Sequence, residues 1–109
     1  MAKTITLDVE GTKYTLEYTR DSAKTIEKQG FTPAGLNETP NITVPILVHG
    51  AFLAHHRLTS SSMIDKIYAS IHKKDEFVIK LAEMYSDVTS TLFDDPDESA
   101  GNSDWEANW

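Results

Sequence analysis

The most constraining feature of this 109-residue sequence lies near its start, where a two-residue break separates two stretches of alternating apolar and polar residues. Residues 4–9 and 13–18 alternate in this way, and Glu10 and Gly11 lie between them. Such alternation is typical of strands with one buried face, and glycine readily takes the positive φ of a tight hairpin turn. The sequence therefore predicts a β-hairpin over roughly its first 20 residues.

The apolar pattern also predicts the register of this hairpin. A two-residue loop places all the apolar side chains on one face, whereas a three-residue loop would mix the two faces. The predicted pairs are Val9 with Thr12, Asp8 with Lys13, Leu7 with Tyr14 and Ile5 with Leu16. Because an isolated hairpin is only marginally stable in water, we expect helices or another copy to cover its apolar face.

A short helix is expected directly after the hairpin. Asp21 is a suitable N-cap for a helix over residues 22–29, which Gly30 would end. Phe31 then falls where a Schellman ending places its hydrophobic contact, against Ile26.

Three further helices are expected after a loop over residues 32–41. The first, over residues 43–56 with Thr43 as its cap, is apolar on most sides, which is typical of a central helix or of a subunit contact. The run of Thr and Ser at residues 59–62 offers several caps for the second, among which Ser62 with Asp65 resembles a capping box, and Asp75 can cap the third. Segregated strands and helices indicate the α+β class: an N-terminal β-hairpin, a short helix and a three-helix C-terminal body.

The acidic charge is concentrated at the end of the chain. The sequence has 10 Lys and Arg against 17 Asp and Glu. Six of the acidic residues, and no Lys or Arg, lie in residues 94–109. We therefore expect a single α+β domain over residues 1–93 and an acidic, flexible tail over residues 94–109.

The charge pattern argues against a nucleic-acid partner. Binding to phosphates needs a basic face, and the tightest basic row is Arg20, Lys24 and Lys28, which a helix would present as a solvated face.

Candidate catalytic and metal-binding residues do not form a recognisable pattern. His49 and His56 could share a helix face, but no third ligand has suitable spacing for zinc, and a histidine at a helix end is more often a cap. The serines at 60–62 next to His55 lack a nucleophile elbow and are typical of a helix cap. The five glycines match no phosphate-binding loop. We expect no catalytic residue, no cofactor and no metal, hence a protein that is not an enzyme.

Three further features suggest a compartment. The sequence has no cysteine, no apolar run long enough to cross a bilayer and no leader-like start. We therefore expect a cytoplasmic protein with no membrane partner.

Trp105 and Trp109, both tryptophans of the chain, lie in the acidic tail. Tryptophan is favoured in interaction hot spots, so we predict that both rings insert into an apolar groove on a partner or on a neighbouring copy. The alternative is that the tail packs back on its own domain.

We also predict a homo-oligomer, because the central helix has more apolar faces than a small body can cover. Phe52 and Leu53 are expected on different faces, one internal and one between subunits.

Four segments of the sequence carry a resemblance to a known group of proteins. They are YTLEYTR at residues 14–20, IEKQGF at 26–31, GAFLAHH at 50–56 and NSDWE at 102–106. Together they resemble tail assembly chaperones from long-tailed phages and prophages of Gram-positive bacteria. The resemblance implies a non-enzymatic factor in the bacterial host cytoplasm that binds the tape-measure protein and tail-tube subunits. The alternatives are a structural tail component, such as a tube or connector subunit, and a small DNA-binding regulator.

Overall fold

The computed structural model describes residues 3–93 and 106–109, and it has the α+β architecture that the sequence predicts. The elements in chain order are β1 (Thr4–Val9), β2 (Thr12–Glu17), α1 (Arg20–Lys28), α2 (Gly35–Glu38), α3 (Pro40–Ala51), α4 (Ser61–Ser70), α5 (Lys74–Ser90) and the 3₁₀ turn η1 (Thr91–Phe93). The predicted flexibility of the tail falls largely on residues 94–105, which lie outside the described residues.

The hairpin has the predicted register. β1 and β2 pair antiparallel with Leu7 opposite Tyr14 and Ile5 opposite Leu16. Glu10 has φ +51° and Gly11 has φ +85°. Positive φ at both central residues is the mark of a type I′ turn, whose twist matches that of the two strands.

Helix α1 begins two residues earlier than predicted and ends one residue earlier, at Lys28, and the assignment of Asp21 as its cap is wrong. Thr19 is the cap: its hydroxyl accepts the Ser22 N–H at 3.1 Å, and the Ser22 hydroxyl accepts the Thr19 N–H at 2.9 Å. Asp21 lies instead in the first turn, where its charge suits the helix dipole. At the other end Gly30 has φ +104°, and the Phe31 N–H donates to the Ile26 carbonyl at 3.0 Å, as in a Schellman ending.

The predicted loop over residues 32–41 contains the short helix α2, and α3 begins earlier than expected. Pro40 is the first residue of α3, a position where its missing N–H has no cost. Thr43 is therefore not a cap; its hydroxyl lies inside the helix and donates to the Gly35 carbonyl at 2.8 Å, which ties α2 to α3. Helix α3 also ends at Ala51, rather than at His56, and turns follow it.

Helix α4 is capped from within the predicted run at residues 59–62. Ser60 is the cap and accepts the Met63 N–H at 3.2 Å, so α4 does not begin with the capping box of Ser62 and Asp65. Lys73, with φ +57°, precedes α5 in place of a cap by Asp75, which lies in the first turn.

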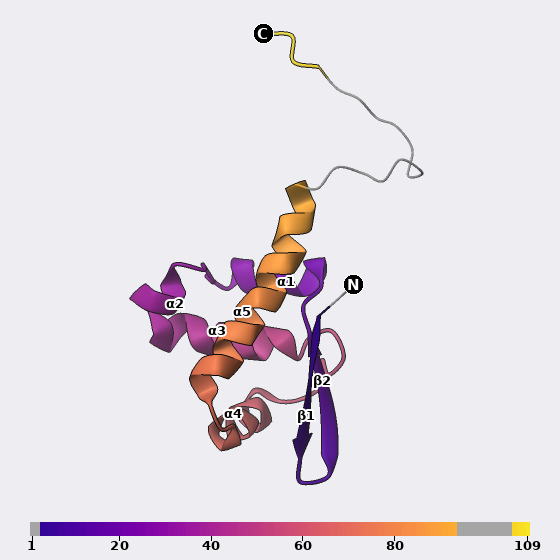
Figure 1. Cartoon of the computed structure of the whole chain (residues 1–109), viewed down its shortest axis with the longest axis vertical. Helices are drawn as coiled ribbons and strands as arrows, with labels where there is room; N and C mark the ends of the chain where they lie inside the picture. Colours follow the sequence, from indigo (N-terminus) through magenta and orange to yellow (C-terminus); the bar gives the residue numbers. More distant parts are fainter. Residues whose placement is uncertain (1–2, 94–105) are drawn as a thin grey trace.

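Helix α3 is the centre of the fold, as its apolar composition predicts. It contacts α1, α2, α4 and α5, and Figure 1 shows α5 crossing in front of it with the hairpin alongside. Gly50 allows the closest approach, because a Cβ at this position would lie 2.3 Å from Cγ2 of Ile26 and 2.7 Å from the Tyr18 hydroxyl. Among the described residues no helix combines the length and apolar character needed to cross a bilayer.

Candidate protein-binding groove

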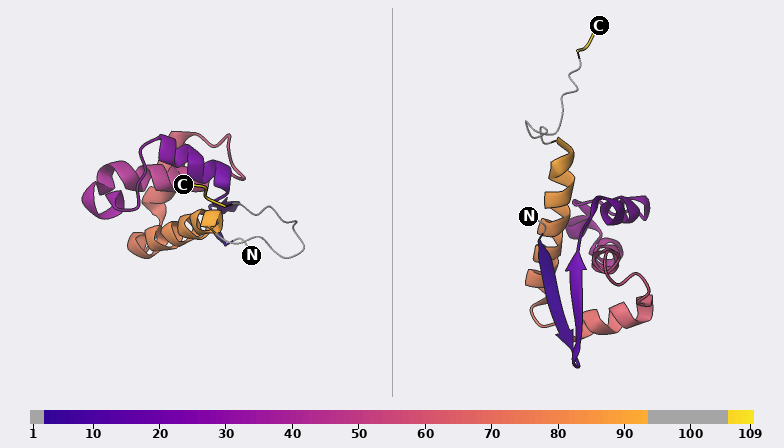
Figure 2. Two further views of the ribbon diagram at one scale, coloured as in Figure 1. Left: turned by 90° about the horizontal axis from the view of Figure 1, so that it is seen from above. Right: turned by 90° about the vertical axis from the view of Figure 1, so that its right-hand side faces the viewer.

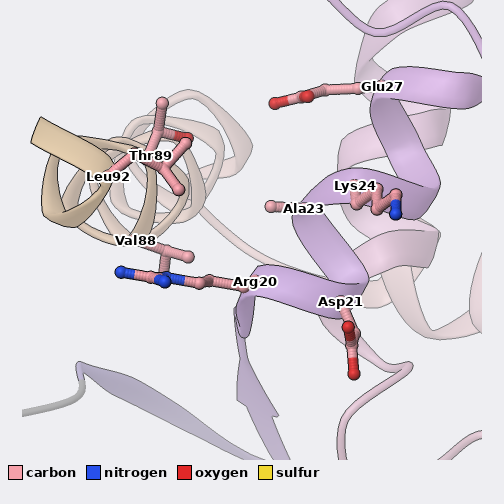
Figure 3. Close-up of a pocket in the computed structure, with 8 residues that line it drawn as sticks. All are labelled: Arg20, Asp21, Ala23, Lys24, Glu27, Val88, Thr89 and Leu92. Atoms are coloured by element: carbon pink, nitrogen blue, oxygen red, sulfur yellow. The ribbon is translucent and has the colours of Figure 1, made fainter.

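A groove of about 300 Å³ lies between α1 and the C-terminal end of α5 (Figure 3). The residues that line it are Arg20, Asp21, Ala23, Lys24 and Glu27 on α1, Val88 and Thr89 on α5, and Leu92 on η1. We call this the α1–α5 groove. Its apolar part comes from Ala23, Val88 and Leu92, and charged side chains of both signs surround that part on the α1 side.

The groove exists because α5 is longer than the core that it covers. Leu81, Met84 and Tyr85 are buried on α5. Val88 and Leu92 continue the same face with helical spacing, yet Val88 is half-buried and Leu92 is 61% exposed. The apolar stripe of α5 therefore continues past the last core layer, where it lies beside α1.

Two sets of hydrogen bonds hold the walls of this groove. The Arg20 guanidinium donates to the carbonyl and hydroxyl oxygens of Thr91 at 3.3 and 3.2 Å. The Tyr85 hydroxyl donates to the Glu27 carboxylate at 2.5 Å. Burial, together with this bond to Glu27, raises the pKa of Tyr85 above its usual value. These contacts fix α1 against α5 at both ends of the groove.

The apolar surface extends beyond the groove to Phe93, whose side chain is 85% exposed. Leu92 and Phe93 therefore add two exposed apolar side chains directly after α5. Exposed apolar patches that are surrounded by polar residues are typical of binding sites for proteins. The geometry therefore suits an apolar segment of another protein.

The histidines that could have formed a metal site have protein partners instead. His49 Nε2 lies 2.7 Å from Asp65 Oδ1, and His55 Nε2 lies 2.7 Å from Glu17 Oε1. His56 Nε2 accepts the Thr15 N–H at 2.9 Å. In the part of the chain that the structure describes, no three His, Cys, Asp or Glu residues are placed to hold a metal ion.

The sequence-predicted binding residues are not brought together. Phe52 is 1% exposed, and its ring packs edge-on against Tyr14, so it belongs to the core. Leu53 is half-buried in the turn after α3. Trp109 is fully exposed, and Trp105 lies outside the described residues.

The α1–α5 groove itself was missed by sequence reasoning. Its two walls are more than 60 positions apart in the chain, and no local pattern indicates that they meet. One signal was available: the apolar stripe of α5 continues to Leu92, beyond the length that a body of this size can bury.

Comparisons with known proteins place the chain in a family without a known function. Neither the curated proteins nor the solved structures include a significant match. The model of DUF5055, a family described as a domain of unknown function, matches residues 1–109. Because that match covers the whole chain, the protein belongs to the DUF5055 family.

Proposed function

We propose that this protein is a non-enzymatic tail assembly chaperone of a long-tailed phage or prophage, which binds the tape-measure protein and tail-tube subunits in the host cytoplasm. The observation that carries the proposal is the α1–α5 groove with the exposed side chains of Leu92 and Phe93. The resemblance of four sequence segments to such chaperones supports the same proposal and supplies the class of partner.

The chemistry of the groove favours an amphipathic helix as its ligand. A helix of this kind would place its apolar stripe over Ala23, Val88 and Leu92. Its flanking charges could then pair with Arg20 and Lys24, or with acidic residues on the same wall of the groove. A tape-measure protein consists largely of long helices, so it would offer many segments of this type to a chaperone.

The test is co-expression of the chain with the tape-measure protein of the same phage, followed by co-purification. Leu92→Asp should reduce the recovery of the tape-measure protein at least roughly tenfold, because it places a charge on apolar surface that binding would bury. Leu58→Asp is the matched control, since Leu58 is 98% exposed and lies outside the groove. The control variant should bind like the parent chain.

Two results would count against the proposal. Equal recovery with Leu92→Asp and with Leu58→Asp would show that the groove does not bind the tape-measure protein. Stoichiometric presence of the chain in purified virions would favour the alternative of a structural tail component.

A further inference from the structure

The two outer edges of the hairpin differ in how they are covered. On the outer edge of β2, the Thr15 N–H donates to His56 Nε2 at 2.9 Å, and Glu17 pairs with His55. On β1, by contrast, no hydrogen bond within the described part of the chain joins the strand to an element other than β2. The turns after α3 thus cover one edge of the sheet, and β1 keeps an open edge.

The register shows which groups of β1 lie on this open edge. Val9 and Thr12 close a two-residue loop and exchange hydrogen bonds, so every second residue of β1 directs its N–H and C=O away from β2. Thr6 is one of these residues. Thr6 lies opposite Thr15 in the hairpin. The Thr15 N–H likewise points away from the partner strand, and it donates to His56. An added strand could therefore pair with the backbone of Thr6.

A cleft of about 340 Å³ lies between β1 and the start of α5. Its apolar lining comes from Ile5, Leu7, Ile71 and Phe77. Figures 1 and 2 agree that β1, not β2, is the strand nearer to α5. An open strand edge beside a helix suits an extended segment, whose backbone would pair with the strand while alternate side chains enter the cleft.

The charges around this cleft favour an acidic ligand. Lys73, Lys80 and His72 line it, with Glu76 as the acidic residue among the lining side chains. This local excess of positive charge occurs in a chain whose formal net charge is −7. Residues 94–109 have the complementary chemistry, with six carboxylates, no Lys or Arg, and both tryptophans.

We propose that the groove between β1 and α5 binds the C-terminal segment, residues 94–109, of a second copy of the chain as an added strand. The indole ring of a tail tryptophan fills the cleft beside Leu7 and Phe77, and the tail carboxylates lie near Lys73 and Lys80. The tail comes from a second copy because Trp109 is fully exposed in the single chain. This self-association uses the end of α5 opposite to the α1–α5 groove and does not depend on the proposed function.

Tryptophan fluorescence of the full chain tests the proposal, because both tryptophans lie in the tail and the signal reports on nothing else. The emission should shift to shorter wavelength as the protein concentration rises, in parallel with an increase in mass by light scattering. Emission typical of solvent-exposed indole at every concentration would overturn the proposal. A short-wavelength emission that does not depend on concentration would also overturn it, since the tail would then bind its own chain.

Two variants at one position test the strand edge. Thr6→Pro removes the outward N–H from an edge strand that can accommodate proline, and it should weaken self-association at least roughly tenfold. Thr6→Val keeps the N–H and should associate like the parent chain. Equal association of the two variants would exclude strand addition at β1.

A pair of charge variants tests the same site without changing the backbone. Lys73→Glu with Lys80→Glu should weaken association at least roughly tenfold, because both new carboxylates would face the acidic tail. Lys28→Glu with Lys66→Glu makes the same change in net charge at exposed residues that line neither groove, and is the control. Equal weakening in both double variants would show that net charge, rather than this groove, controls association.

Discussion

At the scale of single residues, two adjacent histidines have different roles in holding the hairpin. His56 accepts the Thr15 N–H at Nε2, and its ring packs edge-on against Tyr14 with 5.1 Å between the ring centroids. The ring of His55 is more exposed, and its Nε2 lies 2.7 Å from Oε1 of Glu17. His56 thus accepts a hydrogen bond from the backbone of β2, and His55 contributes a polar contact at the surface.

The first prediction compares these two histidines. His56→Phe keeps an aromatic ring against Tyr14 but leaves the Thr15 N–H without its acceptor, so we expect a loss of about 1–3 kcal/mol in the free energy of unfolding. His55→Phe removes a partly exposed polar contact with Glu17 and should cost roughly 0–1 kcal/mol. Urea denaturation of both variants measures the difference. A larger loss for His55→Phe would contradict this account.

The second prediction concerns alkaline pH. Burial raises the pKa of Tyr18 well above the usual 10.0, and its hydroxyl donates to the Leu47 carbonyl. Above pH 10.0 the unfolded chain therefore loses this proton while the folded chain keeps it, so the free energy of unfolding should fall as the pH rises further. Tyr18→Phe should make this fall shallower while lowering stability at neutral pH by about 0.5–1.5 kcal/mol. Denaturant titration at several pH values measures how steeply the free energy of unfolding falls above pH 10.0. An equal fall in the variant and in the parent chain would show that Tyr18 is not its cause.

At the scale of elements, the third prediction tests which residue begins α1. Thr19→Ala removes the hydroxyl that accepts the Ser22 N–H and should lower the free energy of unfolding by about 1 kcal/mol. Asp21→Ala should cost less, because Asp21 contributes only a charge near the helix start. Thermal unfolding of the two variants gives the comparison. A larger loss of stability for Asp21→Ala than for Thr19→Ala would mean that Asp21 is the cap.

The elements also show which parts of the fold local patterns can predict. The hairpin register was predicted correctly because a period of two and a two-residue turn leave one arrangement that buries every apolar side chain. Before α1 and α4, Ser, Thr or Asp residues lie close together and all can cap, so the sequence does not single out one of them. The starts of α3 and α5 were wrong for another reason, because neither helix has a side-chain cap in the structure. Thr19 and Ser60 are the caps because their backbones are extended, which composition does not reveal.

Two other features escaped prediction because they depend on contacts between distant residues. Helix α2 has four residues, too few for a periodic pattern, and the Thr43 hydroxyl on α3 ties it down. The α1–α5 groove and the cleft beside β1 arise where elements meet that are far apart in sequence. Sequence reasoning expected one of Phe52 and Leu53 to be internal and the other to lie between subunits; Phe52 is the internal one, and neither residue lines the two grooves.

At the scale of the whole molecule, the long helix α5 separates two surfaces. Its first turns lie beside β1, and its last turn extends past the core beside α1 (Figure 1). The proposed partner helix and the proposed second copy therefore use opposite ends of one rigid element. Both could bind at the same time, so self-association and partner binding should be separable by mutation.

The fourth prediction uses this separation. Deleting residues 94–109 should leave the thermal unfolding midpoint at low protein concentration nearly unchanged, because the buried apolar residues of the described chain all lie between Leu16 and Tyr85. The same deletion should abolish concentration-dependent association, since it removes both tryptophan anchors and six carboxylates. Leu92→Asp, at the other end of α5, should associate like the parent chain. Light scattering and calorimetry on the three proteins check these outcomes. A large loss of stability in the truncated monomer would show that the tail instead clasps its own domain, and unchanged association would show that the tail takes no part in it.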